Sequence, residues 1–105
     1  MKEFTLYGEK HYFYITDMFG DGSQLALYLK RSSDDEKIAY PTIWGKDLED
    51  YETAKNALSA ALESINQSAA DFYGKPVEEK QGQALLKHLL DNEVFTQDNK
   101  LKIWK

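Results

Sequence analysis

The stretch Gln24–Arg31, QLALYLKR, decides the fold class of this chain. Leucine occupies positions 25, 27 and 29, and the positions between them hold alanine, tyrosine and lysine. An apolar period of two is typical of a β-strand that buries one face. Two preceding segments, EFTLY (residues 3–7) and HYFYIT (residues 11–16), are rich in the aromatic and β-branched residues that strands favour. The first third of the chain is therefore predicted to form a sheet.

Two further segments shape this predicted sheet. The segment IAYPTIWG (residues 38–45) is predicted to form a fourth strand. Pro41 has no backbone N–H to donate a hydrogen bond to a neighbouring strand, so this strand lies at an edge or breaks there. DMFGDGS (residues 17–23) has the carboxylates of a ligand loop, yet Phe19 and Tyr28 occupy liganding positions of an EF-hand that starts at Asp17. A glycine-rich segment between two strands is typical of a β-hairpin, and a turn is the prediction here.

From Asp47 onward the apolar period becomes helical. One predicted stripe comprises Leu48, Tyr51, Leu58, Leu62, Ile65, Ala69 and Phe72, with Ala54 and Ala61 beside it. We expect Asp47 to cap this helix and Gly74 to end it. At about 1.5 Å per residue the helix spans roughly 40 Å, so we also expect a bend near residues 66–68.

A second helix is predicted over residues 77–92, with Pro76 in its first turn and Gly82 inside it. Leu101 and Ile103 then alternate with lysines as in a final strand. The predicted order is β-β-β-β-α-α-β. We expect an α+β fold with a mostly antiparallel sheet of four to five strands, two helices packed on one face, and a single domain over residues 1–105.

Composition excludes several classes of protein. The chain has no cysteine, which removes disulfides and thiolate chemistry. The N-terminal MKEFTLYGEK lacks the apolar core of a signal peptide, and no apolar run approaches the ~20 residues that a membrane span needs. We therefore expect a cytoplasmic protein that does not enter the membrane.

Catalytic and metal-binding motifs are missing from the sequence. The two histidines, His11 and His88, are far apart, and His88 with Asp91 provides two ligands where a metal site needs three or four. No serine lies in a nucleophile elbow. We expect a protein that is not an enzyme, with no catalytic residues, no metal and no cofactor.

The aromatic residues of the predicted sheet suggest a binding face. If Phe13 and Ile15 face the core, Tyr12 and Tyr14 face outward near Tyr28. Such tyrosines could stack nucleic-acid bases or anchor a protein partner. The alternative is that helices cover this face, or that tyrosine is present only because it suits a strand.

Charge is concentrated in one segment. Seven acids and two lysines lie between Asp34 and Glu52, so this segment accounts for the whole net charge of −5. Acids set around exposed aromatic residues suit contact with the basic surface of another protein. The predicted partner-binding residues are Asp34, Asp35, Glu36, Tyr40, Trp44, Asp47, Glu49, Asp50 and Glu52. The alternative is a turn followed by a helix start whose acids are merely solvated.

The leading functional hypothesis is a small acidic protein-binding module. In size and composition, though in no motif, the chain is similar to small accessory proteins of bacterial phages and mobile elements. That resemblance implies an inhibitor of a host nucleic-acid-handling enzyme, with an anti-defence role. The acidic balance counts against direct nucleic-acid binding. The alternative function is a nucleic-acid-binding regulator that uses the second helix and the basic tail, DNKLKIWK (residues 98–105).

Overall fold

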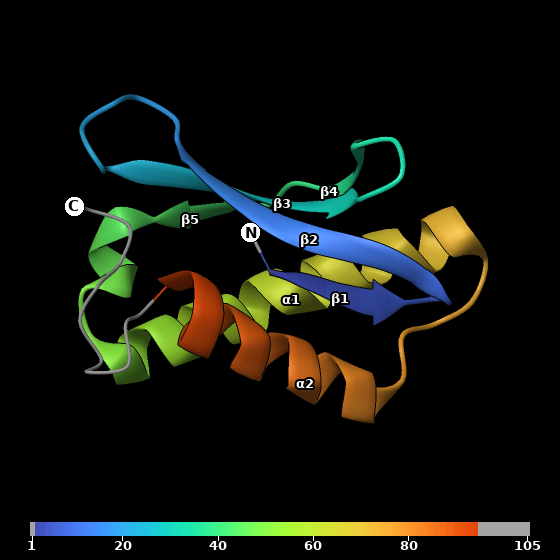
Figure 1. Cartoon of the computed structure of the whole chain (residues 1–105). Helices are drawn as coiled ribbons and strands as arrows, with labels where there is room; N and C mark the ends of the chain where they lie inside the picture. Colours follow the sequence, from blue (N-terminus) through green and yellow to red (C-terminus); the bar gives the residue numbers. More distant parts are fainter. Residues whose placement is uncertain (1, 95–105) are drawn as a thin grey trace.

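The computed structural model describes residues 2–94 and has the α+β architecture that the sequence predicts. Both helices lie on one side of an antiparallel sheet (Figure 1). The elements, in chain order, are β1 (Glu3–Leu6), β2 (Glu9–Asp17), β3 (Gln24–Arg31), β4 (Glu36–Ala39), β5 (Thr42–Trp44), the 3-10 helix η1 (Gly45–Leu48), α1 (Tyr51–Tyr73), α2 (Glu79–His88) and the π-helical turn η2 (Leu89–Val94). None of the helices in residues 2–94 is long and apolar enough to cross a membrane.

β3 is the central strand of the sheet. β1 pairs with β2, β2 pairs with β3, and both β4 and β5 pair with β3. The predicted fourth strand is broken at Tyr40 and Pro41, as proline allows: β4 pairs with the end of β3 and β5 pairs with its beginning. The predicted strand around Leu101 lies outside the described residues.

The segment between β2 and β3 is a hairpin loop, as predicted. The carboxylate of Asp17 accepts hydrogen bonds from the backbone amides of Gly20 at 3.0 Å and Gly22 at 2.9 Å. Both glycines have positive φ, 78° and 77°, a conformation that costs residues with a side chain free energy. Aspartate and glycines therefore build the turn itself.

The inner face of the sheet and the helices enclose the core. The leucines of β3 are fully buried, together with Phe13 of β2 and Leu58 and Ile65 of α1. The predicted helical stripe is thus confirmed in its middle. Phe72, predicted to belong to it, is 46% exposed, because it lies in the last turn of α1, outside the core cluster; the guanidinium of Arg31 lies over its ring, 5.5 Å from the centroid.

The N-terminal cap of α1 differs from the prediction. Asp50, not Asp47, caps the helix: its carboxylate accepts a 3.0 Å hydrogen bond from the backbone amide of Thr53. Asp47 lies in η1, a separate turn that precedes the helix. Gly74 ends α1 as predicted, with a left-handed φ of 80°. The helix is continuous through residues 66–68, where a bend was predicted.

α2 is shorter than predicted and packs closely on α1. It begins at Glu79, after Pro76, and gives way to η2 at Leu89. A Cβ at Gly82 would lie 3.3 Å from Nδ2 of Asn66 on α1. The glycine that weakens the helix locally therefore permits the close approach of the two helices.

One polar side chain, His11, is completely buried in the inner face. Nδ1 lies 3.0 Å from the carbonyl oxygen of Glu9, so Nδ1 donates, and Nε2 accepts from the hydroxyl of Tyr73 at 2.7 Å. Burial lowers the pKa of His11. The hydrogen bond joins β2 to the last residue of α1.

Candidate functional site

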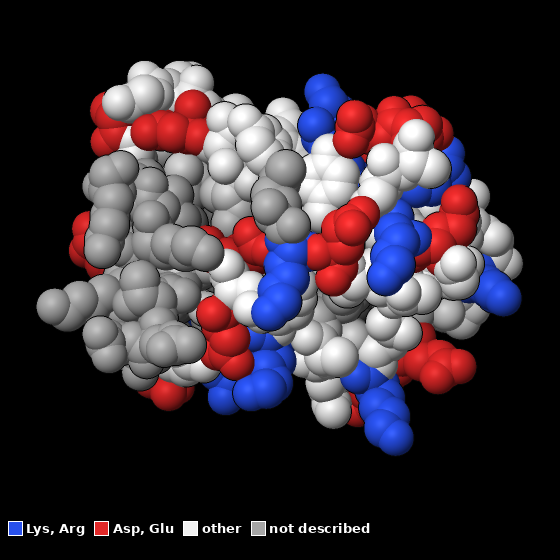
Figure 2. Space-filling model, in the orientation of Figure 1, with Lys and Arg blue, Asp and Glu red and all other residues white. Residues whose placement is uncertain are grey.

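The fold separates the acidic segment into two groups. Asp34, Asp35 and Glu36 follow the end of β3, whereas residues 45–52 follow β5, which pairs with the beginning of β3. At about 3.3 Å per residue, the eight-residue β3 places the groups roughly 20 Å apart. Figure 2 shows carboxylate atoms both over the β2–β3 loop and over the β3–β4 hairpin. The predicted acids therefore do not form one patch.

The acids of the β3–β4 hairpin hold the turn together. Arg31 donates to both carboxylate oxygens of Asp34, at 3.0 Å from Nε and 2.7 Å from Nη2, and lowers the pKa of Asp34 to about 2. The hydroxyl of Tyr12 donates to Asp35 at 2.6 Å, which raises the pKa of Tyr12 to about 12. Glu36 begins β4 opposite Arg31. These contacts close a hairpin and give this group a structural role.

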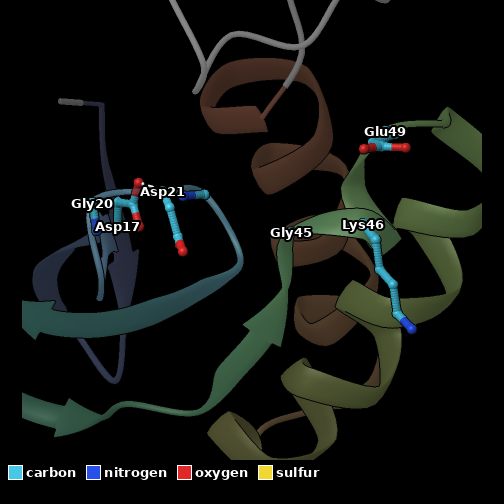
Figure 3. A pocket seen from close by; sticks show the side chains of 7 residues that line it. Asp17, Gly20, Asp21, Gly45, Lys46 and Glu49 are labelled. Carbon is cyan, nitrogen blue, oxygen red and sulfur yellow. Dashed lines mark hydrogen bonds between the residues drawn. The ribbon is translucent and has the colours of Figure 1, made fainter.

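The fold places two acids from a distant part of the sequence beside the second group, residues 45–52. Asp17 and Asp21 of the β2–β3 loop lie across from Lys46 and Glu49 and line a hollow of about 560 Å³ with them. In Figure 3 the side chain of Lys46 points away from the two aspartates. We call this region the acidic end and define it by Asp17, Asp21, Asp47, Glu49, Asp50 and Glu52.

The carboxylates of the acidic end differ in their hydrogen bonds. Asp17 accepts hydrogen bonds within the β2–β3 loop, and Asp50 accepts the one that caps α1, as described above. The backbone amide of Ser23 donates to Asp21 at 2.9 Å, and hydrogen bonds from Ser23 lower the pKa of this carboxyl. Glu49 and Glu52 are exposed, and Asp47 is half-buried. Asp17, Asp21 and Asp50 are exposed too, but they accept the hydrogen bonds of the loop and the cap, so the carboxylates of Glu49 and Glu52 are the ones that the fold does not use.

The two predicted aromatic contacts fall in different places. Trp44 is 55% exposed at the end of β5, immediately before η1, so it borders the acidic end. Tyr40 is 67% exposed, and its ring lies 6.4 Å from the ring of Tyr28 in the middle of the sheet. Of the two predicted aromatic residues, only Trp44 lies beside the acidic end.

Tyrosines occupy the outer face of the sheet, which points away from α1 and α2. Tyr14 lies opposite Tyr28 in the β2–β3 ladder, with 6.1 Å between ring centroids. The prediction that Tyr12 and Tyr14 face away from the core is confirmed, since Phe13 between them is buried. We call Tyr14, Tyr28 and Tyr40 the tyrosine row.

Sequence reasoning missed two features of these surfaces. It interpreted residues 17–23 as a turn without placing Asp17 and Asp21 beside residues 45–52, since only the fold brings the two segments together. It also missed Lys37, whose ammonium lies 5.2 Å from the ring centroid of Tyr28. Lys37 precedes residue 38, where the fourth strand was predicted to begin, and the burial of β4 does not alternate, so the sequence assigned this lysine to the turn.

Comparison with known proteins provides no relative from which a function could be transferred. The chain matches no protein-family model, no curated protein and no solved structure. Within residues 2–94 no group of three or more histidine, aspartate or glutamate side chains is arranged to hold a metal ion. The basic tail of the alternative hypothesis lies outside the described residues.

Proposed function

We propose that the chain is a non-enzymatic, cytoplasmic binding module whose acidic end contacts the basic surface of another protein. One observation carries the proposal: Trp44, 55% exposed, lies beside Asp47, at the edge of a region in which the fold brings carboxylates from two separate chain segments together. An exposed aromatic side chain next to charged groups is the usual composition of a binding hot spot.

Electrostatics support a basic partner. The acidic end has six carboxylates, and the neighbouring Lys46 points away from Asp17 and Asp21 (Figure 3). A concentrated negative potential accelerates association with a positive surface and disfavours partners of like charge. Rigid elements position the charges, because a hairpin loop and the start of α1 hold them.

A more specific form of the proposal names the class of partner. Enzymes that handle nucleic acids present basic channels to phosphate groups. Carboxylates fixed around a hollow can occupy such a channel in place of phosphates. We propose that the chain inhibits a host enzyme of this class, as an accessory protein of a phage or mobile element.

The experiment is capture from a bacterial lysate, with and without nuclease treatment, on four immobilised proteins. They are the wild type, Trp44→Ala, the acidic-end variant Glu49→Gln/Glu52→Gln, and the control Glu63→Gln/Glu79→Gln, which changes exposed acids elsewhere on the helices. Asp50 is left intact because it caps α1. Intact folding of each variant is checked by circular dichroism.

We expect the wild type and the control to retain the same protein partner, and the Trp44 and acidic-end variants to lose at least 90% of it, which corresponds to about tenfold weaker binding. Equal retention by all four proteins would contradict the proposal. A partner that disappears when the lysate is treated with nuclease would favour the nucleic-acid-binding alternative instead.

A further inference from the structure

The tyrosine row crosses the outer face of the sheet at right angles to the strands. Tyr14 comes from β2, Tyr28 from β3 and Tyr40 from the break between β4 and β5. Ring centroids follow one another at 6.1 Å and 6.4 Å, with interplanar angles of 32° and 36°. Three aromatic rings therefore form a continuous path over three neighbouring segments of the sheet.

Two lysines, Lys30 and Lys37, lie next to the tyrosine row. The ammonium of Lys30 lies 5.1 Å from the ring centroid of Tyr14 and 5.7 Å from that of Tyr28, and the ammonium of Lys37 lies 5.2 Å from Tyr28. Lys30 and Lys37 face each other in the β3–β4 ladder. Lysine has a long, flexible stem, so each ammonium can leave its ring and follow an anionic ligand.

The surroundings of the row are polar. The next positions along the strands are Thr16, Ala26 and Thr42, which pair with one another across the sheet. None of the residues of this face paired with β3 is a large aliphatic side chain, whereas the inner face of β3 is leucine throughout its centre. The face also has Ala26 and, opposite Gln24, Trp44. A face of aromatic residues, threonine and lysine is a poor match for an apolar peptide and a good match for groups that are both flat and polar.

We propose that this face binds single-stranded nucleic acid, whose bases stack on the tyrosine row while Lys30 and Lys37 contact the phosphates. Stacking on aromatic side chains of an open sheet, with cations along the backbone, is the general mode of single-strand recognition. Among the described residues, both helices lie on the opposite face and leave the row open (Figure 1). The inference goes beyond the proposed protein-binding function and uses different side chains.

The negative net charge of the chain does not prevent this binding. Tyr28 is near the centre of β3, roughly 10 Å from either end at about 3.3 Å per residue, and the one acid of the β3–β4 hairpin bound on this face, Asp35, accepts a hydrogen bond from the hydroxyl of Tyr12. The Debye length is about 8 Å at physiological ionic strength, so exposed end charges are largely screened from a ligand on the row. The charged groups that contact the rings of the row are the two lysines.

The test is fluorescence anisotropy with a labelled oligouridine, over a range of salt concentrations. We expect the wild type to bind, and Tyr14→Thr/Tyr40→Thr to weaken binding by roughly fivefold or more for each ring removed. Lys30→Gln and Lys37→Gln should each reduce the steepness of the log affinity against log salt plot by about 0.7. Threonine suits a strand, and unfolding curves verify that the variants fold.

Matched controls keep the test specific. Phe19→Thr removes an aromatic ring that is 66% exposed on the β2–β3 loop, and Lys55→Gln/Lys80→Gln removes two exposed lysines from the helices. These variants should bind as the wild type does. Glu49→Gln/Glu52→Gln should not weaken oligonucleotide binding, so failure of this inference and failure of the proposed protein binding are distinguishable.

Three results would overturn the inference. The first is no binding of the oligonucleotide at low salt. The second is equal affinity for the single strand and for a duplex, whose bases are not available for stacking. The third is displacement by polyglutamate with the same dependence on tyrosines and lysines, which would identify an acidic peptide as the ligand.

Discussion

The two faces of the sheet have opposite chemistry although they share the same strands. On β2, Phe13 is 0% exposed and its neighbour Tyr14 is 42% exposed. The inner face is apolar apart from His11 and is covered by the helices, while the outer face has tyrosine, threonine and lysine. This difference indicates that inward positions hold the fold together and that outward positions are available for contact with other molecules.

The strongest way to test this contrast is to truncate one residue on each face. Phe13→Ala leaves a cavity in the core and should lower the free energy of unfolding by about 3–5 kcal/mol. Tyr14→Ala should lower it by less than about 1 kcal/mol, because much of the ring is in solvent. Urea denaturation measures both; equal losses would show that the outer face is also structural.

A smaller effect is expected at the polar contact within the inner face. Tyr73→Phe removes the hydroxyl that donates to the fully buried Nε2 of His11 but keeps the ring that stacks on Tyr7 at 4.4 Å. Leaving a buried acceptor without a donor should cost about 1–3 kcal/mol of stability. As a control, Tyr40→Phe also removes one hydroxyl but on the exposed face, and its stability should stay unchanged.

The same contrast applies within the acidic end. Asp50→Ala removes the cap of α1 and should lower the melting temperature by a few degrees. Glu52→Ala changes an exposed acid of the first turn that does not cap the helix, so it should leave the melting temperature nearly unchanged. Calorimetry compares the two variants. If both variants melt at the same temperature, the carboxylate of Asp50 has no capping role in solution.

The smallest effect on stability is expected at the β3–β4 hairpin. Arg31 lowers the pKa of Asp34 from 3.8 to about 2, so the ionised form is favoured in the folded state. The stabilisation is present above pH 3.8 and is lost as the pH falls through 2. NMR titration should find this low pKa in the wild type and a value near 3.8 in Arg31→Gln; identical values would rule out the ion pair.

Local patterns in the sequence predict much of this fold. Alternation around Leu27 predicts β3, glycine at 74 predicts the end of α1, and Pro41 predicts the interruption between β4 and β5. These features depend on side chains close in sequence. Asp47 and Asp50 are both suitable caps, however, and the sequence does not reveal that η1 separates them.

The candidate site was harder to predict, because it depends on pairing over long distances. Asp34 and Glu49 belong to one acidic segment, yet pairing of β4 and β5 with different ends of β3 separates them. The same pairing brings Tyr40 to Tyr28 and Lys37 to Lys30. Charge clustering along the chain therefore did not correspond to charge clustering on the surface.

Amide NMR shifts during titration with a single-stranded oligonucleotide show, residue by residue, whether the outer positions of the sheet bind a ligand. We expect the shifts to concentrate at Tyr14, Tyr28, Lys30, Lys37 and Tyr40, while the amides of α1 and α2 remain unchanged. Shifts confined to the helices, or no shifts at all, would contradict this expectation.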